Sequence, residues 1–505
     1  MTINEIIELK RIAFRSLMRH KMKTFLTCAG VMVSTALYIW MQSWLGGLML
    51  ESRRNIVNYE MGAAKVQTKL YFQNKDELPS YETFTGWEVY AKALENAGYN
   101  AAPRYTFSGT IYSQEAFAPV AVYGIEPDAE KRILLYADYV EFGRFVKNGE
   151  FQAVLGAMTA EKLKAGIPTR IPKDEFEMFV SGAADAGEAE FIRSCYSPME
   201  TNIETKTLYV LKRSIDKASS ERLWNICDNA GRNDVRIATV IDFKDDSGKV
   251  RHVNQVIDLK IAGIINSPDP ATNFNAVYVP LDVLQDEEGM MLQGAVTEIL
   301  IRAKDAIPGS AAEKKESKEA IRAGLELKLA EAGEMLPAEL DVYTWQEYNE
   351  DYLGYEKLES GSTKILSFLL FFLALIGISN TMLLAILERT KETGMMRALG
   401  MSSGQITAAY FFEALAIGFL GSILGVILGC ILNYPMVKYG LDFSGMLEQF
   451  GGSMGYRISG NFRGMWDFPV IIFTPLVATL LSGLMAIAPV RRALRMNIIE
   501  VLRFE

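Results

Sequence analysis

The chain has 505 residues, of which 52 are basic and 61 acidic, and 50% are hydrophobic. Its formal net charge is −9, and only 2 of its residues are histidines. Its two histidines, His20 and His252, fall on opposite sides of the membrane in the orientation predicted below, so they cannot together bind zinc or serve a catalytic triad. The acidic balance also argues against a protein that binds nucleic acid through phosphate contacts.

The first predicted element is a basic leader, residues 1–23, whose apolar residues fall on one helical face. This pattern favours an amphipathic helix lying along the inner membrane surface, and a frayed polar leader is the alternative. The uncharged stretch 24–50 follows. It is longer than the apolar region of a secretory signal, which has about 7–15 residues, so we predict that it stays as a first transmembrane helix.

A polar block, 51–345, comes next and is predicted to fold as a mixed α/β extracytoplasmic domain. Residues 51–364 hold 36 basic and 51 acidic side chains. Short β-rich runs at 118–123, 154–155, 207–211, 235–241, 256–265 and 276–279 alternate with helical patterns at 86–97, 158–165, 218–230 and 315–332. The block exceeds the usual domain size, so we expect two subdomains: 51–155 with 256–345, and 156–255.

This block contains Cys195 and Cys227, and their spacing alone does not decide whether they form a disulfide. The segment 346–364 is predicted to be a helical stalk that leads the chain into the next apolar stretch.

Three more uncharged stretches follow: 365–387, then 414–437 within a helix predicted over 407–437, and 468–490. Twenty-three helical residues rise about 34 Å, which is enough to cross a hydrocarbon core about 30 Å thick. The predicted fold is therefore an α-helical membrane domain of four transmembrane helices. The large mixed α/β extracytoplasmic domain is inserted between helices 1 and 2.

Basic residues predict the orientation. They gather in the leader, in the link between the second and third spans, and in the tail after residue 490. Lysine and arginine near span ends stay on the cytoplasmic side. We therefore expect cytoplasmic N- and C-termini in a cell (inner) membrane, with residues 51–364 outside the cytoplasm.

Catalysis has little support in the sequence. One G-x-S-x-G match spans 400–404, but that motif requires a histidine beside its serine, and none is near. The chain contains no G-x-x-x-x-G-K-[ST] loop. We therefore expect no enzyme activity, no metal site and no cofactor in this chain, and any ATP and magnesium to be bound by a partner.

The link between the second and third spans is predicted to hold a short charged helix that stops at Gly400 and can transmit a push from a cytoplasmic partner. The third span then carries four glycines, Gly418, Gly421, Gly425 and Gly429, at a spacing that lets two helices approach closely in lipid. The alternative interpretation is an ordinary connector followed by a glycine-rich span. Glu413, at the start of this span, is an intramembrane polar residue for which we expect a structural role.

The run ERTKETGMMRALGMSSGQITAAYFFEALAIGFLGSILGVILG, residues 388–429, closely resembles the signature segment of the FtsX/MacB/LolC-LolE-type permeases, the type VII ABC transporter superfamily. The ending APVRRAL followed by IIEVLR, and the start AFRSLMRHKMKTFLT, are similar to the same family. The resemblance implies that 365–505 is an FtsX-like permease domain and that 51–345 is a MacB-like periplasmic core domain.

Family members are dimers that work with ATPases on the cytoplasmic side and carry motion outward through long helices, which is called mechanotransmission. The resemblance therefore implies an ABC ATPase subunit and a second permease subunit, in a homodimer or heterodimer, as partners. It also implies an ATPase-coupling helix formed by Glu388, Arg389, Glu392, Gly394, Met395, Arg397, Ala398, Leu399 and Gly400.

The layout without an ATPase on the chain most resembles LolC- and LolE-like subunits, so lipoprotein release from the outer leaflet is the leading expectation, with a lipoprotein substrate. An orphan MacB-like permease that exports a peptide, lipid or drug with a periplasmic adaptor is the alternative. An FtsX-like regulatory or scaffold protein without transport is a third possibility.

Overall fold

The computed structural model describes residues 21–200, 207–212, 215–244, 250–286, 290–305, 317–388, 390–442 and 461–494. Its described residues form two compact units. The helical unit contains the described residues up to Glu51 and from Asp351 onward, and the sheet unit is Ser52–Glu350. Most of the predicted leader, 1–20, lies outside the described residues.

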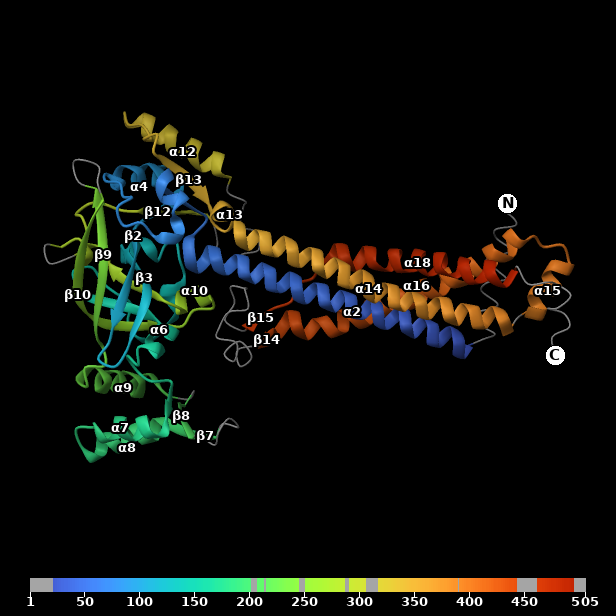
Figure 1. Ribbon diagram of the computed structural model, residues 1–505, viewed down its shortest axis with the longest axis horizontal. Helices are drawn as coiled ribbons and strands as arrows, with labels where there is room; N and C mark the ends of the chain where they lie inside the picture. The colour runs from blue at the N-terminus through green and yellow to red at the C-terminus, as the bar shows by residue number, and fades with distance from the viewer. Residues whose placement is uncertain are drawn as a thin grey trace. The chain divides into compact units, whose positions relative to one another are not determined.

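The helical unit is built from long apolar helices (Figure 1). They are α2 (Lys21–Asn55), α14 (Glu350–Glu388), α16 (Ser403–Tyr439) and α18 (Phe468–Leu494). The unit also contains the short polar helix α15 (Thr390–Ala398) and a small pair of strands, β14 (Leu441–Asp442) and β15 (Asn461–Phe462). Among the described residues, three segments are long and apolar enough to cross a membrane: Thr24–Met61, Ser403–Tyr439 and Phe468–Arg492. This chain is a membrane protein. The remaining predicted span, 365–387, lies within α14, where many side chains fall outside the described residues, so the count of four stays a prediction.

The sheet unit is organised around one ten-stranded sheet, ordered β13-β1-β12-β2-β3-β11-β5-β10-β4 with β9 paired to both β10 and β2. The double pairing of β9 closes β2, β3, β11, β5, β10 and β9 into a barrel. The strands are β1 (Ala64–Thr68), β2 (Tyr99–Tyr112), β3 (Phe117–Ile125), β4 (Val140–Gly143), β5 (Gln152–Gly156), β9 (Asp234–Lys244), β10 (Val250–Ile265), β11 (Ala276–Pro280), β12 (Glu298–Ala303) and β13 (Leu340–Thr344).

Buried apolar and exposed polar residues alternate along the strands, and the apolar ones fill the inside of the barrel. On β9, Val235 and Ile237 are buried and pair with the buried Leu259 and Ile257 of β10, whereas Arg236 between them is exposed. Residues two apart on a strand share one face, so the inward positions of β2, β9 and β10 join one apolar core.

Short helices connect and cover the strands: α3 (Lys69–Gln73), α4 (Trp87–Asn96), α5 (Pro127–Glu130), α6 (Ala157–Lys162), α9 (Lys217–Asn229), α10 (Pro270–Asn273), α11 (Leu281–Leu284), α12 (Lys318–Glu331) and α13 (Trp345–Tyr348), with the turns η1 (Ile56–Met61), η2 (Lys75–Glu77) and η3 (Tyr136–Tyr139). The predicted helices at 86–97, 158–165, 218–230 and 315–332 are confirmed as α4, α6, α9 and α12 within a few residues. The predicted strands are likewise present as β3, β5, β8, β9, β10 and β11.

A smaller sheet, β6-β8-β7, forms a lobe with two helices at the end of the sheet unit opposite α12 (Figure 1). Its elements are β6 (Arg170–Pro172), α7 (Lys173–Ser181), α8 (Ala186–Cys195), β7 (Tyr196–Glu200) and β8 (Thr207–Leu211). We expected 156–255 to form a separate subdomain, but the structure places β9 and the first part of β10 in the barrel. The reason is that the apolar face of β9 is buried against β10 and β2 rather than in the lobe.

Cys195 and Cys227 are both buried and both carry free thiols in this structure. Burial raises the pKa of the Cys227 thiol to about 12 and raises the pKa of Cys195 as well. A thiol reacts as its thiolate, so both groups are protected from reaction by exclusion from water and by protonation.

We predict that Cys227 of the folded chain resists iodoacetamide at pH 8, because with a pKa of about 12 only about one thiol in ten thousand is ionised. Mass spectrometry should find Cys227 modified only after unfolding, whereas an introduced Ser181→Cys, at an exposed position of α7, is modified quickly. Rapid labelling of native Cys227, or recovery of a Cys195–Cys227 disulfide, would contradict the structure.

A buried charge network fixes the turn η1, where the chain passes from α2 into the sheet unit. Arg104 on β2 donates through Nε to Glu130 Oε1 at 2.9 Å and through Nη1 to the Glu60 carbonyl at 3.2 Å. Arg302 on β12 donates to the Ile133 carbonyl at 2.7 Å and to Asn58 Oδ1 at 2.5 Å. Both arginines are 2% exposed, so water cannot replace these bonds.

Carboxylates and tyrosines balance the charge of Arg104. Glu130 also accepts from Tyr136 Oη at 2.8 Å, and Glu298 accepts from Lys65 Nζ at 2.8 Å. Burial by itself would lower the pKa of Arg104, but the adjacent Glu130 outweighs it and holds that pKa well above its ordinary value. The guanidinium therefore stays charged inside the protein, and the network depends on its partners remaining in place.

We predict that Arg104→Ala lowers the free energy of unfolding of the sheet unit by about 3–5 kcal/mol, because it leaves the buried carboxylate of Glu130 unpaired. Urea unfolding of the detergent-solubilised chain, followed by resistance to protease, measures this loss. The control is Arg236→Ala, which breaks an exposed pair with Asp258 and should leave the unfolding midpoint near that of the wild type. Equal effects of the two substitutions would contradict the role of the buried network.

Candidate functional site

The helix α15 follows α14 and precedes α16 in the chain, and it ends at a turn formed by Gly400. Gly400 has φ +91°, its amide donates to the Arg397 carbonyl at 3.0 Å, and the Met401 amide donates to the Met396 carbonyl at 3.0 Å. A left-handed residue after the last turn is the usual way to satisfy the final carbonyls, and glycine takes that conformation without strain. The turn therefore sets a fixed boundary between α15 and α16.

Ser402, the serine of the G-x-S-x-G match, caps α16. Its Oγ accepts from the Gln405 amide at 3.3 Å, and Gln405 Oε1 accepts from the Ser402 amide at 2.9 Å. This reciprocal capping box starts a helix and is not the strand-to-helix elbow that a hydrolase needs. Among the described residues no group of three His, Cys, Asp or Glu side chains could hold a metal ion.

The apolar residues of α15 separate into two sets. Met396 packs beside Met401 and Leu494 against a buried cluster of Ile406, Tyr410 and Val490 from α16 and α18. In contrast, Met395 is 54% exposed and Leu399 is 87% exposed. The apolar side chains of this segment therefore have one part that anchors the helix and another that is open.

Arg397 strengthens the anchor, since its Nη1 donates to the Leu494 carbonyl of α18 at 3.4 Å. Gly394 is buried, and Ala398 and Gly400 are exposed. Arg389 lies outside the described residues, as do the side chains of Glu388 and Glu392. The structure thus brings together on α15 most of the predicted coupling residues and fixes the helix to α16 and α18.

The glycines of α16 lie at two different helix contacts. A methyl group on Gly421 would lie 2.8 Å from the Cys28 carbonyl oxygen of α2, and one on Gly425 would lie 2.6 Å from Thr35 Cβ. A methyl group on Gly429 would lie 3.2 Å from Ala36 Cα. These three glycines therefore allow α16 to approach the backbone of α2 at distances that any side chain would prevent.

Gly418 lies against α18 instead, where a methyl group would be 2.6 Å from Ser482 Cβ. Beside it, Ser422 Oγ lies 3.4 Å from Thr479 Oγ1, which in turn donates to the Pro475 carbonyl at 2.7 Å. Glu413 is buried on the same helix, 6% exposed. Small and polar residues thus line the contact of α16 with α18.

A further contact was not anticipated from the sequence. Gly47 of α2 lies against the Arg463 carbonyl, and Ser43 Oγ donates to the Met465 carbonyl at 2.6 Å. The Met465 amide donates back to the Ser43 carbonyl at 3.2 Å. The adjacent pair Gly46-Gly47, unusual within an apolar helix, was the signal available in the sequence for this close approach.

We predict that Gly425→Leu weakens the helical unit by about 1–3 kcal/mol or more, because the side chain must displace Thr35 and the Met32 carbonyl. A lower melting temperature of the purified chain in detergent would report the loss. Gly30→Leu is the matched control, since nothing lies within 4 Å of a methyl group at that position. Equal melting temperatures for the two variants would contradict the packing.

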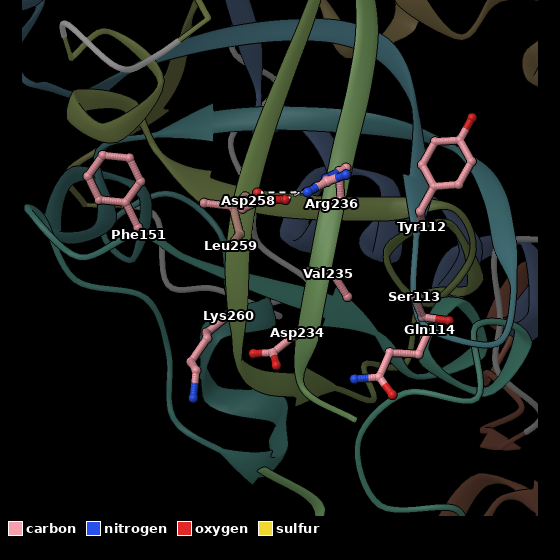
Figure 2. Close-up of a pocket in the computed structure, with 10 residues that line it drawn as sticks. All are labelled: Tyr112, Ser113, Gln114, Phe151, Asp234, Val235, Arg236, Asp258, Leu259 and Lys260. Carbon is pink, nitrogen blue, oxygen red and sulfur yellow. Dashed lines mark hydrogen bonds and ion pairs between the residues drawn. The ribbon is translucent and has the colours of Figure 1, made fainter. Parts of the chain in front are cut away.

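The sheet unit has a separate hollow on the outside of the barrel, with a volume of about 630 Å³ (Figure 2). Figure 2 shows Tyr112 and Phe151 on opposite sides of it. Arg236 and Asp258 pair across its wall at 2.6 Å, which raises the pKa of Arg236 and lowers that of Asp258. Lys260 is paired with Asp228 at 3.2 Å. Its charged lining consists of Arg236 and Lys260 against Asp234 and Asp258, so the two signs balance and neither is concentrated for an ionic ligand.

Comparison with known proteins places the α15 region in a family. Residues 364–498 match the family model described as FtsX-like permease C-terminal. This part of the chain is therefore similar to an FtsX-like permease domain. The matched range includes α15, α16, α18 and the part of α14 from residue 364 onward.

Three relatives show how far the permease likeness extends. An uncharacterized ABC transporter permease of Methanocaldococcus jannaschii is 34% identical over 132 residues, 26% of this chain and 29% of that protein. The ABC transporter permease YtrF of Bacillus subtilis is 31% identical over 132 residues, with shares of 26% and 29%. The macrolide export ATP-binding/permease protein MacB of Campylobacter jejuni is 27% identical over 213 residues, 41% of this chain and 30% of that protein.

The matched segments thus span less than a third of these relatives. Among solved structures, the extracellular domain of the noncanonic ABC-type transporter YknZ from Gram-positive bacteria aligns with 56% of this chain and 99% of its own, at 12% identity. The TM-score of 0.26 is too low to support a conclusion about the sheet unit.

Proposed function

We propose that this chain is the permease subunit of an ABC transporter of the FtsX/MacB type, and that a separate ATPase subunit docks on α15. The observation that carries the proposal is the exposed apolar pair of Met395 and Leu399 within the FtsX-like permease domain. An exposed leucine at the end of an anchored helix is a suitable centre for a protein interface, because a partner can bury it fully. The ATPase partner would bind ATP and magnesium, and this chain would supply no catalytic residue.

The anchoring of α15 supports a mechanical role. A push on Met395 and Leu399 would pass through Met396 to Ile406 of α16 and Val490 of α18, because these side chains are packed together. From there α16 contacts α2 through the three glycines at close range. We propose that this is the path of mechanotransmission, with the termini in the cytoplasm and the sheet unit outside it.

Export is the better-supported form of transport. The relatives described above are ABC permeases and a macrolide exporter, and this favours a MacB-like export permease over the lipoprotein-releasing role that the layout first suggested. The cargo would be a peptide, a lipid or a small amphipathic compound handled by the sheet unit, with a periplasmic adaptor as a further partner. A lipoprotein substrate would instead support LolC/LolE-like release.

We predict that Leu399→Asp reduces co-purification of the partner ATPase about tenfold or more, since loss of a central apolar anchor costs about 2 kcal/mol or more of binding energy. The measurement is the amount of ATPase recovered with the tagged chain from detergent extracts, together with ATP hydrolysis by the complex. The matched control is Met335→Asp, in the sheet unit, at a side chain that is 84% exposed. The control should leave both quantities unchanged.

Unchanged ATPase recovery in Leu399→Asp would contradict docking on α15. Failure to recover any ATPase with the wild-type chain would contradict the transporter proposal and support a regulatory or scaffold role without transport. Recovered lipoproteins, rather than an adaptor, would move the proposed cargo to lipoproteins.

A further inference from the structure

The outer wall of the barrel carries apolar side chains at positions that face water. Phe117 of β3 lies opposite Tyr112 of β2, which lies opposite Arg236 of β9, so the three form one row across neighbouring strands. The two rings stack with their centroids 5.9 Å apart and remain 65% and 42% exposed. Val240 of β9 and Val256 of β10 are also exposed on the same face. A strand face that meets water normally carries polar residues, so this wall indicates a surface for a partner.

The hollow of about 630 Å³ lies beside this row (Figure 2). Phe151 borders it on the side opposite Tyr112, and the Lys260 amide fixes the backbone there by donating to the Phe151 carbonyl at 3.1 Å. Figure 2 shows Arg236 and Asp234 between the two aromatic side chains. A hollow of between about 300 and 1,000 Å³ can enclose a small ligand or a short part of a chain. This one has two apolar sides and a polar floor.

Arg236 and Asp234 both keep hydrogen-bonding groups that are not used within the described part of the chain. Arg236 donates through Nε and Nη2 to Asp258 at 2.6 and 3.0 Å, and its Nη1 has no partner among the described residues. The Asp234 carboxylate likewise forms no hydrogen bond or ion pair with them. Lys260, in contrast, is paired with Asp228. The hollow therefore offers one donor and one acceptor, two residues or about 7 Å apart along β9.

We propose that this hollow binds a peptide in extended conformation, with one apolar side chain between Tyr112 and Phe151. An extended peptide repeats every two residues, or about 7 Å, so one of its carbonyls can accept from Arg236 while a later amide donates to Asp234. The peptide backbone carries no net charge, which agrees with the balanced charges of the lining. Residues further along the peptide would cover the apolar wall beside the hollow.

This inference rests on the proposed function and deepens it, because it selects the peptide among the proposed cargoes and assigns it a contact on the sheet unit. A phospholipid headgroup fits less well, because its phosphate needs an unpaired cation and both Arg236 and Lys260 are paired with carboxylates. A compact compound would fill the hollow but leave the apolar wall beside it uncovered. An extended peptide uses both the polar floor and the apolar wall.

Fluorescence anisotropy with the full chain in lipid nanodiscs tests this site. The probe is a labelled hexapeptide of alternating leucine and alanine with both ends blocked, and the comparison peptide carries N-methyl groups on its backbone amides. Arg236→Ala and Tyr112→Ala should each raise the Kd of the probe about tenfold, because each removes one of the proposed contacts. The matched control is Arg193→Ala, which breaks an exposed pair with Glu177 at 2.6 Å on the lobe and should leave the Kd unchanged.

Equal Kd values for Arg236→Ala and Arg193→Ala would overturn the proposal, as would equal binding of the two peptides or equal signals from nanodiscs with and without the chain. Asp234 gives an independent check: Asp234→Leu should raise the Kd about tenfold, and Asp234→Asn, which keeps a carbonyl oxygen, should raise it less. The measurement needs no ATPase. Peptide binding by a chain that recruits no ATPase would therefore support this inference and contradict the proposed function, and ATPase recruitment without peptide binding would do the reverse.

Discussion

The point at which the chain leaves the α2 helix and joins the sheet is held by buried charge. Arg104 and Arg302 reach from neighbouring strands to the Glu60 carbonyl and the Asn58 side chain of η1. Such bonds cannot be exchanged for water inside the protein, so moving the turn would leave a buried N–H donor of each arginine without its acceptor. The segment η1, which follows α2, is therefore fixed to the strands of the sheet unit by interactions that are costly to break.

The segment in which the chain leaves the sheet unit, at the end of β13, is also fixed by hydrogen bonds. Thr344 ends β13 and forms a capping box with Glu347 at the start of α13, and the Trp345 amide donates to the Ala63 carbonyl. Lys65 lies 4.5 Å from the centre of the Tyr348 ring and pairs with Glu298, which belongs to the same charge network. Both segments that join the sheet unit to the helical unit are thus fixed on neighbouring strands, β1 and β13. This arrangement agrees with the proposed transmission of helix movement to the sheet unit.

In the helical unit the corresponding constraint is steric. Gly421, Gly425 and Gly429 allow α16 to touch the backbone of α2, and helices in lipid associate through such packing because water exclusion contributes little there. The same helix carries Ile406 and Tyr410, against which Met396 of α15 packs. One helix therefore connects the proposed ATPase dock with the first membrane helix.

The elements that could not be predicted from the sequence are those without a clear local pattern. The strand β2 contains Pro103, Arg104 and Gly109, residues that normally argue against the centre of a sheet, yet it pairs with β3, β9 and β12. Its Arg104 is tolerated because Glu130, distant from it in the sequence, is buried beside it. The helices α7 and α8 are short and rich in charged residues, and packing of Phe176 and Ile192 into the common core fixes them. Barrel closure by β9 could not be predicted either, because it depends on a pairing between residues more than 120 positions apart.

The sequence by itself determined the long apolar helices, the mixed α/β character of the block between them and the permease segment after residue 364. These features depend on local length, composition and motif, so they can be recognised without knowledge of any partner residue. Only the tertiary structure decided that Met396 is anchored while Met395 and Leu399 are open, that Gly418 lies against α18 while the next three glycines lie against α2, and that β9 closes the barrel. Each of these depends on which distant residues share a contact, and that is set by packing and burial across the whole chain rather than by the pattern of any one segment.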